Sequence, residues 1–410
     1  MELRPLRAAL AAALLMSLCA AAAFAQSGAT RPRRVLPNSE PTPTPAPAPV
    51  RTTTTTSRPV TSTPTGGATG AATAGGDTTH AYTLLQQKQY AEAAREAKQI
   101  AGANPTNAEA WKIAGFAEFN LRQYADAATD LQRALDLQRK TGAEDANTVD
   151  ALAQAYARTE QFDRALPLLT AATTRAGATP DPALLYLRGL AEFRTGKPAD
   201  AERTFNAAVK ADPKNAAALF YLGRINYERG DTDAAVALLN RATTADARFA
   251  EAWTVLTYAY LRRAAAAGQG PKADADYLGA VRASEALLRL RNDEAAARLN
   301  AQALISAQQF PRAALVLERF ATDPKAQGPT LYLLGVAHSR TKNFPKAIAA
   351  LERAAQQTPD DANVYRELGY AYEVSKQYAK ALAAYERGVQ LAPDDADFKA
   401  SAERVRPFAK

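Results

Sequence analysis

The sequence predicts an all-α fold, a solenoid of about nine stacked helix pairs followed by a short capping helix. The stretch ELGYAYEVSKQYAKALAAYERGVQLAPDD at 367–395 matches LLGVAHSRTKNFPKAIAALERAAQQTPDD at 333–361 in its key positions, 34 residues further along the chain. An internal period of this length indicates a helical unit that stacks on copies of itself. The composition before residue 79 differs, and it predicts two N-terminal segments ahead of the solenoid.

The first segment, residues 1–25, is predicted to be a secretory signal peptide. Two arginines precede the apolar run AALAAALLMSLCAAAA, and AFA before Gln26 supplies the small residues of a cleavage site after Ala25. The alternative is an uncleaved membrane anchor, because residues 8–25 come close to the shortest apolar run that spans a bilayer. Lipid attachment at Cys19 is disfavoured because a leucine precedes it. Cleavage would leave a chain without cysteine or methionine, and therefore without disulfides.

The second segment, residues 26–78, is predicted to be a disordered linker. It is rich in Pro, Thr, Ala and Gly and has very few large apolar residues, so it cannot bury a core of its own. The plain interpretation is a spacer. A more specific one is a tether that holds the folded part away from a membrane or wall, with threonines that carry sugars.

The net charge of +8 does not indicate a nucleic-acid-binding protein. Residues 1–79 hold seven arginines against three acids, so half of the excess lies ahead of the solenoid. The other half is spread over more than three hundred residues, whereas nucleic-acid-binding proteins concentrate their basic residues on one face. We expect no nucleic-acid partner.

The shared positions of the two matching stretches each have a physical role. Gly369 and Ala381 are small, as two antiparallel helices require where they cross at a short distance. Large side chains such as Tyr385 fill the space beside the crossing. Proline then ends the second helix, and Asp361 or Asp395 caps the helix that follows.

This pattern resembles the tetratricopeptide repeat (TPR), and the resemblance covers the chain from Thr79 onward. It implies a right-handed superhelical solenoid. The small crossing residue recurs at Ala81, Gly115, Ala153, Gly189, Gly223, Thr257, Ala301, Gly335 and Gly369. The intervals are 34, 38, 36, 34, 34, 44, 34 and 34 residues.

Placing each copy by its crossing residue predicts a solenoid over 79–410. The predicted repeats are 79–107, 108–145, 146–181, 182–215, 216–249, 250–293, 294–327, 328–361 and 362–395. The long sixth interval comes from RRAAAAGQGPKADAD at 262–276, which we expect to lengthen the sixth pair and to open a Gly-Pro loop.

A capping helix is predicted at 396–408. After Asp395 the spacing places Phe398, Ala402 and Val405 on one helical face. The ends of a solenoid need such a cover, because the last repeat otherwise leaves its apolar side open to water.

In this family the first helix of each pair lines the inner face of the solenoid. The inward residues lie three positions before and one, four and five positions after the crossing residue, and here they are rich in rings and arginines. The rings of the candidate site are Phe116, Phe119, Tyr186, Phe193, Phe220, Tyr227, Tyr258, Tyr332 and Tyr370. The arginines are Arg158, Arg194, Arg224, Arg262, Arg298, Arg340 and Arg366, one in each repeat from the third to the ninth.

Such a lining suits an extended or helical peptide of acidic character. Arginine donates a planar fork of hydrogen bonds to carboxylates, and rings offer flat apolar area at low entropic cost. The alternative is that the arginines pair with acids at the same positions across neighbouring repeats. Those acids are Glu109, Asp150, Glu228, Glu251 and Glu373.

The sequence favours a non-enzymatic protein. The only two histidines are His80 and His338, neither of which has a partner at metal-ligand spacing, and His338 occupies a packing position. The chain has neither a phosphate-binding glycine loop after a strand nor a GxSxG motif. We predict no catalytic residues, no metal and no cofactor.

The sequence therefore predicts an exported scaffold, periplasmic or otherwise envelope-associated, that binds a protein or peptide partner in the inner groove during assembly or secretion of envelope components. Membrane contact is expected only through an uncleaved N-terminus, and the sequence sets no oligomeric state. The alternative is a protein that binds or guides a polysaccharide, with rings stacked on sugars and arginines on uronate groups.

Replacing Arg194, Arg224 and Arg262 together is expected to weaken partner binding without lowering the melting point, because inward arginines that serve a ligand add little to packing. Binding and thermal unfolding of the triple variant test this. A large loss of stability with unchanged binding would show that the three arginines are structural.

Overall fold

The computed structural model describes residues 77–177 and 179–409. The predicted signal peptide and residues 26–76 of the predicted linker lie outside the described residues. The described residues form helices and no strands, arranged as nine antiparallel pairs and a C-terminal cap. The predicted all-α solenoid is thereby confirmed.

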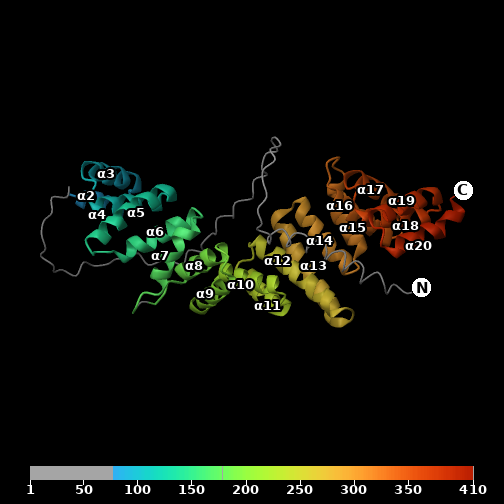
Figure 1. The fold of residues 1–410 in the computed structure, drawn as a ribbon, viewed down its shortest axis with the longest axis horizontal. Coiled ribbons are helices and arrows are strands. Elements are labelled where there is room, and N and C mark those ends of the chain that lie inside the picture. The colour runs from blue at the N-terminus through green and yellow to red at the C-terminus, as the bar shows by residue number, and fades with distance from the viewer. Residues whose placement is uncertain (1–76, 178, 410) are drawn as a thin grey trace.

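The pairs follow one another along the long axis of the molecule (Figure 1). They are α2 (Thr79–Gln86) and α3 (Tyr90–Ala103), α4 (Ala108–Asn120) and α5 (Tyr124–Lys140), α6 (Ala146–Arg158) and α7 (Phe162–Thr173), α8 (Pro182–Arg194) and α9 (Pro198–Ala211), α10 (Ala216–Arg229) and α11 (Thr232–Ala245), α12 (Ala250–Ala267) and α13 (Pro271–Arg291), α14 (Glu294–Ser306) and α15 (Phe310–Ala321), α16 (Gly328–Arg340) and α17 (Phe344–Gln357), and α18 (Ala362–Val374) and α19 (Tyr378–Leu391). The cap is α20 (Ala396–Val405) with a 3-10 turn, η2 (Arg406–Phe408).

Most first helices begin at an aspartate or asparagine whose side chain accepts a hydrogen bond from the first turn. The predicted caps Asp361 and Asp395 do so for α18 and α20, with the amides of Asn363 and Asp397 as donors. Such a cap satisfies one of the backbone donors that a helix leaves open at its start. The junctions between repeats are therefore defined locally.

The turn inside most pairs contains one residue in the left-handed region, seven positions after the crossing residue. These residues are Lys88, Arg122, Glu160, Gly196, Gly230, Gln308, Lys342 and Lys376, with φ between 57° and 96°. In the sixth pair the equivalent residue is Ala264, which lies inside α12. That helix consequently continues to Ala267, and α13 begins only at Pro271 after a short turn with glycines at 268 and 270. The insert thus lengthens both helices of the sixth pair.

In five pairs the first helix crosses the second at a glycine. A Cβ atom on Gly223 would lie 2.6 Å from Leu239 Cγ, and one on Gly369 would lie 2.5 Å from Tyr385 Cε1, both well inside carbon–carbon contact distance. The sequence analysis paired Gly369 with Ala381. The structure shows Tyr385 instead, because the closest approach falls one helical turn further along α19.

Buried apolar clusters follow one another along the stack of helix pairs. One buried cluster joins α5 to α8, and another joins α13 to α18. At the C-terminal end Phe398, Ala402 and Val405 of α20 are all buried, as predicted, and the Phe398 ring lies directly against Gly388 of α19. Among the described residues no helix is both long and apolar enough to cross a membrane.

Replacing Gly223 with alanine is expected to lower stability by roughly 1 to 3 kcal/mol, because the added methyl group overpacks the helix crossing. Gly102 in α3 is the matched control, since a Cβ there meets nothing within 4 Å. Gly102→Ala should raise stability by about 0.5 to 1 kcal/mol through helix propensity alone. Urea unfolding followed by circular dichroism measures both, and an unchanged or higher stability of Gly223→Ala would contradict the close crossing.

Candidate functional site

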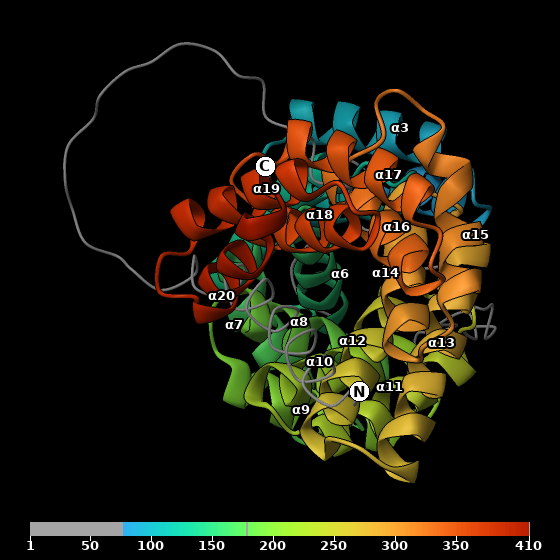
Figure 2. The ribbon, with the colours of Figure 1, turned by 90° about the vertical axis from the view of Figure 1, so that its right-hand side faces the viewer.

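The first helices form the inner layer of the superhelix. In Figure 2, which views the solenoid along its length, α6 to α18 with even numbers lie nearer the centre than their odd-numbered partners. Successive first helices also contact each other directly, as α14 contacts α16 and α16 contacts α18. Helices on the inner side of a curve must lie closer together, so both observations place the predicted lining residues on the concave helices.

Most of the predicted rings are packed against neighbouring side chains and do not stand free on the inner face. Phe220 is only 6% exposed, and Phe116 and Phe119 pack against the core cluster of α5 to α8. Burial also raises the pKa of the Tyr186 and Tyr332 phenols, which keeps both protonated. Tyr370 is the exception at 44% exposed.

Three of the predicted arginines stack on rings of the preceding repeat. The guanidinium carbon of Arg224 lies 5.1 Å from the centre of the Phe193 ring, and that of Arg262 lies 5.5 Å from the Tyr227 ring. Arg194 lies 5.6 Å from the ring of Phe162. Stacking of this kind holds a guanidinium flat while its N–H edge can still donate to a ligand.

These three arginines, together with Arg158, form what we call the open arginine row, on α6, α8, α10 and α12. Within the described part of the chain Arg158, Arg194 and Arg262 have no carboxylate partner. Arg262 donates to the Tyr227 carbonyl oxygen at 2.9 Å. Arg224 pairs at 2.8 Å with Glu228 of its own helix, and both side chains are nearly half exposed.

The three C-terminal arginines of the candidate site are engaged within the protein. Arg340 donates two hydrogen bonds, of 2.9 and 2.7 Å, to the buried carboxylate of Glu367 in the next repeat. Arg366 pairs at 2.5 Å with Asp395, the cap of α20. Arg298 donates to the Gln327 side chain at 2.7 Å. The first contact joins two repeats, and the other two join a first helix to the residue that precedes α16 or α20.

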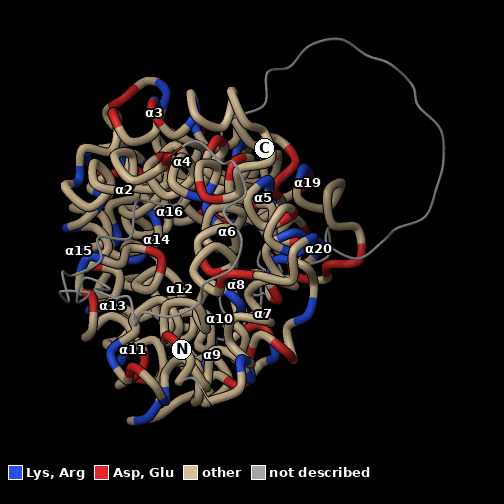
Figure 3. Tube along the Cα trace, turned by 90° about the vertical axis from the view of Figure 1, so that its left-hand side faces the viewer, with Lys and Arg blue, Asp and Glu red and all other residues tan. Residues whose placement is uncertain are grey.

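The alternative of pairing with these five acids across neighbouring repeats is not seen among the described residues, and the one pair between the two sets lies within a single helix. Of the five acids, Glu228 alone pairs with one of the seven arginines. Asp150 pairs with Arg175, Glu373 with Arg404 and Glu109 with a lysine. Over the described residues basic and acidic positions are interspersed (Figure 3), so the open row differs from its surroundings by its pairing and not by a large patch of charge.

A buried charged cluster, which the sequence analysis missed, lies where α3, α4 and α5 meet. Glu118 is 2% exposed and Asp130 is 4% exposed. Lys98 forms an ion pair with Glu118, and its ammonium nitrogen lies 3.5 Å from Asp130 Oδ2. Burial, opposed by Lys98, raises the pKa of Glu118 to about 7, and burial raises the pKa of Asp130 as well.

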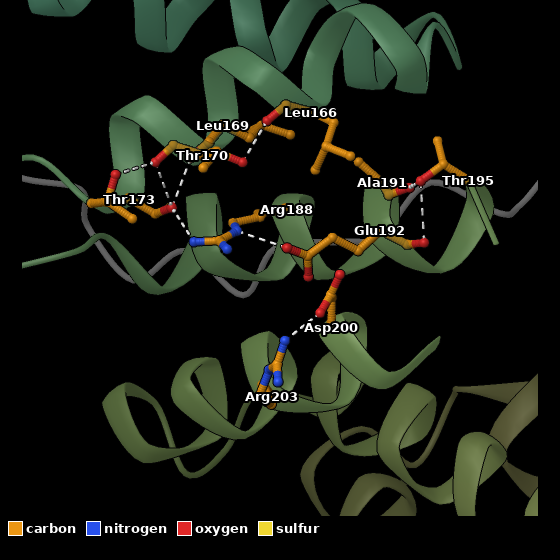
Figure 4. Close-up of polar contacts among 11 residues, drawn as sticks. Leu166, Leu169, Thr170, Thr173, Arg188, Ala191, Glu192, Thr195, Asp200 and Arg203 are labelled. Carbon is orange, nitrogen blue, oxygen red and sulfur yellow. Dashed lines mark hydrogen bonds and ion pairs between the residues drawn. The ribbon is translucent and has the colours of Figure 1, made fainter. Parts of the chain in front are cut away.

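Glu118 occupies the third position after the crossing residue, where the ninth repeat has a tyrosine. Glu192 takes the same position in the fourth repeat, and it accepts a hydrogen bond of 2.8 Å from Arg188, which also donates to Thr173 (Figure 4). His338 takes it in the eighth repeat, where burial lowers the pKa of the imidazole. In the sequence, a polar residue at a position that another repeat fills with an aromatic residue indicates such a buried polar group. None of the described acids and histidines cluster in a way that could hold a metal ion.

Family models described as tetratricopeptide repeat match residues 78–143, 151–215, 186–248 and 334–406. These matches cover more than half of the chain, and the protein belongs to the tetratricopeptide repeat family. Membership of this family supports a protein–protein interaction scaffold.

Three solved structures show what the chain is similar to. YrrB, described as a TPR protein with an unusual peptide-binding site, is 16% identical, with 49% of this chain and 97% of that chain covered and a TM-score of 0.40. A TPR protein from Parabacteroides merdae is 16% identical, with 64% and 98% covered and a TM-score of 0.40. The APC/C hetero-tetramer Cut9–Hcn1 gives 13% identity, 79% and 95% coverage and a TM-score of 0.29. No curated protein matches the sequence.

Glu118→Gln is expected to remove a pH dependence of stability. Because folding raises the pKa of Glu118, the folded state binds this proton more tightly than the unfolded state. The stability that this proton contributes is complete at a pH below the pKa of the unfolded state, and it is lost as pH rises through about 7. At about 1.4 kcal/mol per pKa unit, the rise from 4.5 to about 7 means that the wild type should lose roughly 3 to 4 kcal/mol relative to the variant between these two pH values. Urea unfolding across the range measures it, with the exposed Glu92→Gln as control. Parallel curves for wild type and Glu118→Gln would contradict the expectation.

Proposed function

We propose that the protein is a non-enzymatic scaffold of the cell envelope that binds an acidic peptide or protein segment along the inner face of α6 to α12. The open arginine row carries this proposal. Within the described residues, four guanidiniums on consecutive concave helices have between them a single carboxylate partner, the surface glutamate Glu228, which pairs with Arg224 of its own helix. A partner with several carboxylates would supply what the chain itself does not.

The stacked geometry favours a specific partner over diffuse attraction. A guanidinium already fixed on a ring loses little conformational freedom when it binds, so more of each hydrogen bond remains as affinity. The row also advances by one helix pair at each step, which spreads its charges along an extended ligand. An acidic segment lying along the groove would meet one arginine in each repeat.

The polysaccharide alternative fits this geometry less well. Sugars bind to aromatic rings by stacking on their flat faces. Here one face of Phe193 and one of Tyr227 are covered by arginines, and Phe220 is buried in the core. Placement in the envelope is the part of the proposal that depends on the predicted signal peptide at residues 1–25 and the linker that follows it.

The proposal predicts that the protein selects acidic peptides through the open arginine row. The test uses an array of short peptides in which Asp and Glu are exchanged for Asn and Gln at constant length. Replacing all four arginines by glutamine should weaken binding to the acidic peptides about tenfold or more, the loss expected when charge-assisted hydrogen bonds are removed. Binding should also fall with rising salt concentration.

The matched control replaces four exposed arginines that lie outside the first helices, Arg241, Arg248, Arg282 and Arg289, with glutamine. It changes the net charge by the same amount and should leave acidic-peptide binding nearly unchanged. An equal loss in the control, or no preference for acidic peptides, would contradict the proposal. Stronger competition by polygalacturonate than by acidic peptides would favour the polysaccharide alternative.

A further inference from the structure

A small pocket of about 120 Å³ opens between α12, α13 and α14. Its lining includes the polar residues Tyr258 of α12 and Arg298 and Gln302 of α14, and the apolar residues Leu287 of α13 and Leu299 of α14. Tyr258, Arg298 and Gln302 occupy inner positions of two successive first helices, so the pocket belongs to the concave face. It is well below the roughly 300 Å³ at which small-molecule sites begin, and its size suits a single side chain or chain end.

The polar side chains that line the pocket are positively charged or neutral. Arg298 and Arg291 contribute guanidiniums, Tyr258 a phenol and Gln302 an amide, and no acidic residue lines the pocket. The two lining leucines are 2% and 5% exposed, so the pocket combines buried apolar side chains with hydrogen-bond donors. A carboxylate at the end of a short apolar stem complements that combination.

The donors are held in place. One nitrogen of Arg298 donates to the Gln327 side chain at 2.7 Å, which anchors the guanidinium without supplying a negative charge. Arg291 donates at 2.9 Å to Asp293, but that carboxylate also caps α14 by accepting from the Ala296 amide at 2.8 Å. Burial raises the pKa of Tyr258, which keeps its hydroxyl a donor.

The pocket also lies where the open arginine row ends. Arg262 is one helical turn beyond Tyr258 on α12, and the next inner arginine after Arg298, Arg340, is already paired with Glu367. A ligand that follows the row therefore meets this pocket at the last step before the inner arginines are occupied. We propose that the pocket binds a carboxylate of the bound segment, an inference that builds on the proposed function.

The carboxylate has two possible sources, an acidic side chain or the C-terminus of the segment, and small probes distinguish them. N-acetyl-glutamate methylamide carries only a side-chain carboxylate, N-acetyl-leucine carries only a terminal one, and N-acetyl-glutamine methylamide carries none. The probes are titrated into protein with isotope-labelled tyrosine rings, and the Tyr258 NMR signal is assigned by its loss in Tyr258→Phe. We expect one of the two carboxylate probes to shift this signal and the glutamine probe to leave it in place.

Arg298→Gln should weaken that binding about tenfold, as expected for the loss of a charge-assisted pair. Arg289→Gln on α13, exposed and outside the pocket, is the matched control and should bind like the wild type. If Arg298→Gln unfolds, Tyr258→Phe takes its place. Binding of the same probe to Tyr258→Phe is followed on the probe's own NMR signals, and weaker binding than to the wild type supports the pocket as the carboxylate site. Equal shifts with the glutamine probe, or no shift with any probe, would overturn the proposal.

The same variants separate this inference from the proposed function. One outcome is that acidic peptides bind the wild type and lose this binding when the open arginine row is replaced, yet bind Arg298→Gln and Tyr258→Phe as tightly as the wild type. In that case the pocket inference fails and the proposed function stands. If no acidic peptide binds, the proposed function fails, while the small probes still decide whether the pocket takes a carboxylate.

Discussion

The close approach of two helices at one small residue is the constraint on which the rest of the structure depends. Where the first helix crosses the second at Gly223 or Gly369, no Cβ atom can be accommodated against the leucine or tyrosine below. This contact sets the distance and angle within a pair, and repeating it sets the position of each pair on the next. The curvature, and with it a concave layer of first helices, follows from that repetition.

Because the pairs repeat, one position in the motif acquires one place in space. The fifth position after the crossing residue holds arginine in the third, fourth, sixth and eighth repeats, and each time it lies on the concave layer. Yet Arg340 forms an ion pair in which its side chain is only 15% exposed, whereas Arg194 and Arg262 stack on rings and have no carboxylate partner among the described residues. Desolvating Arg340 is tolerated only because Glu367 offers two well-directed hydrogen bonds. The same residue type thus links two repeats near the C-terminal end of the solenoid and offers free hydrogen-bond donors in its middle.

Much of the fold could be predicted from the sequence, because helix pairing depends on local patterns. The 34-residue period, the crossing residues and the caps Asp361 and Asp395 are all readable in one dimension. The buried Glu118 was not anticipated, since the periodicity marks a position as inward without saying whether a polar side chain there has a partner. Nor was the left-handed turn residue, which is lysine at 88, 342 and 376 and therefore lacks the usual glycine signal.

Which arginines are occupied was also missed, although a signal exists. Glu367 lies two positions before the crossing residue of the ninth repeat, and from there it reaches the arginine of the repeat before. The same position holds Leu187, Tyr221 and Leu299 in the repeats that follow Arg158, Arg194 and Arg262. None of these can neutralise a guanidinium, and Tyr221 instead stacks at 5.2 Å on Phe205 within the core. The sequence analysis compared each arginine with acids at the equivalent inner positions of neighbouring repeats. The contact that forms is instead diagonal, from an arginine five positions after one crossing residue to an acid two positions before the next. The open row is therefore a consequence of apolar residues at one diagonal position, and placing an acid there would be the direct way for this scaffold to close it.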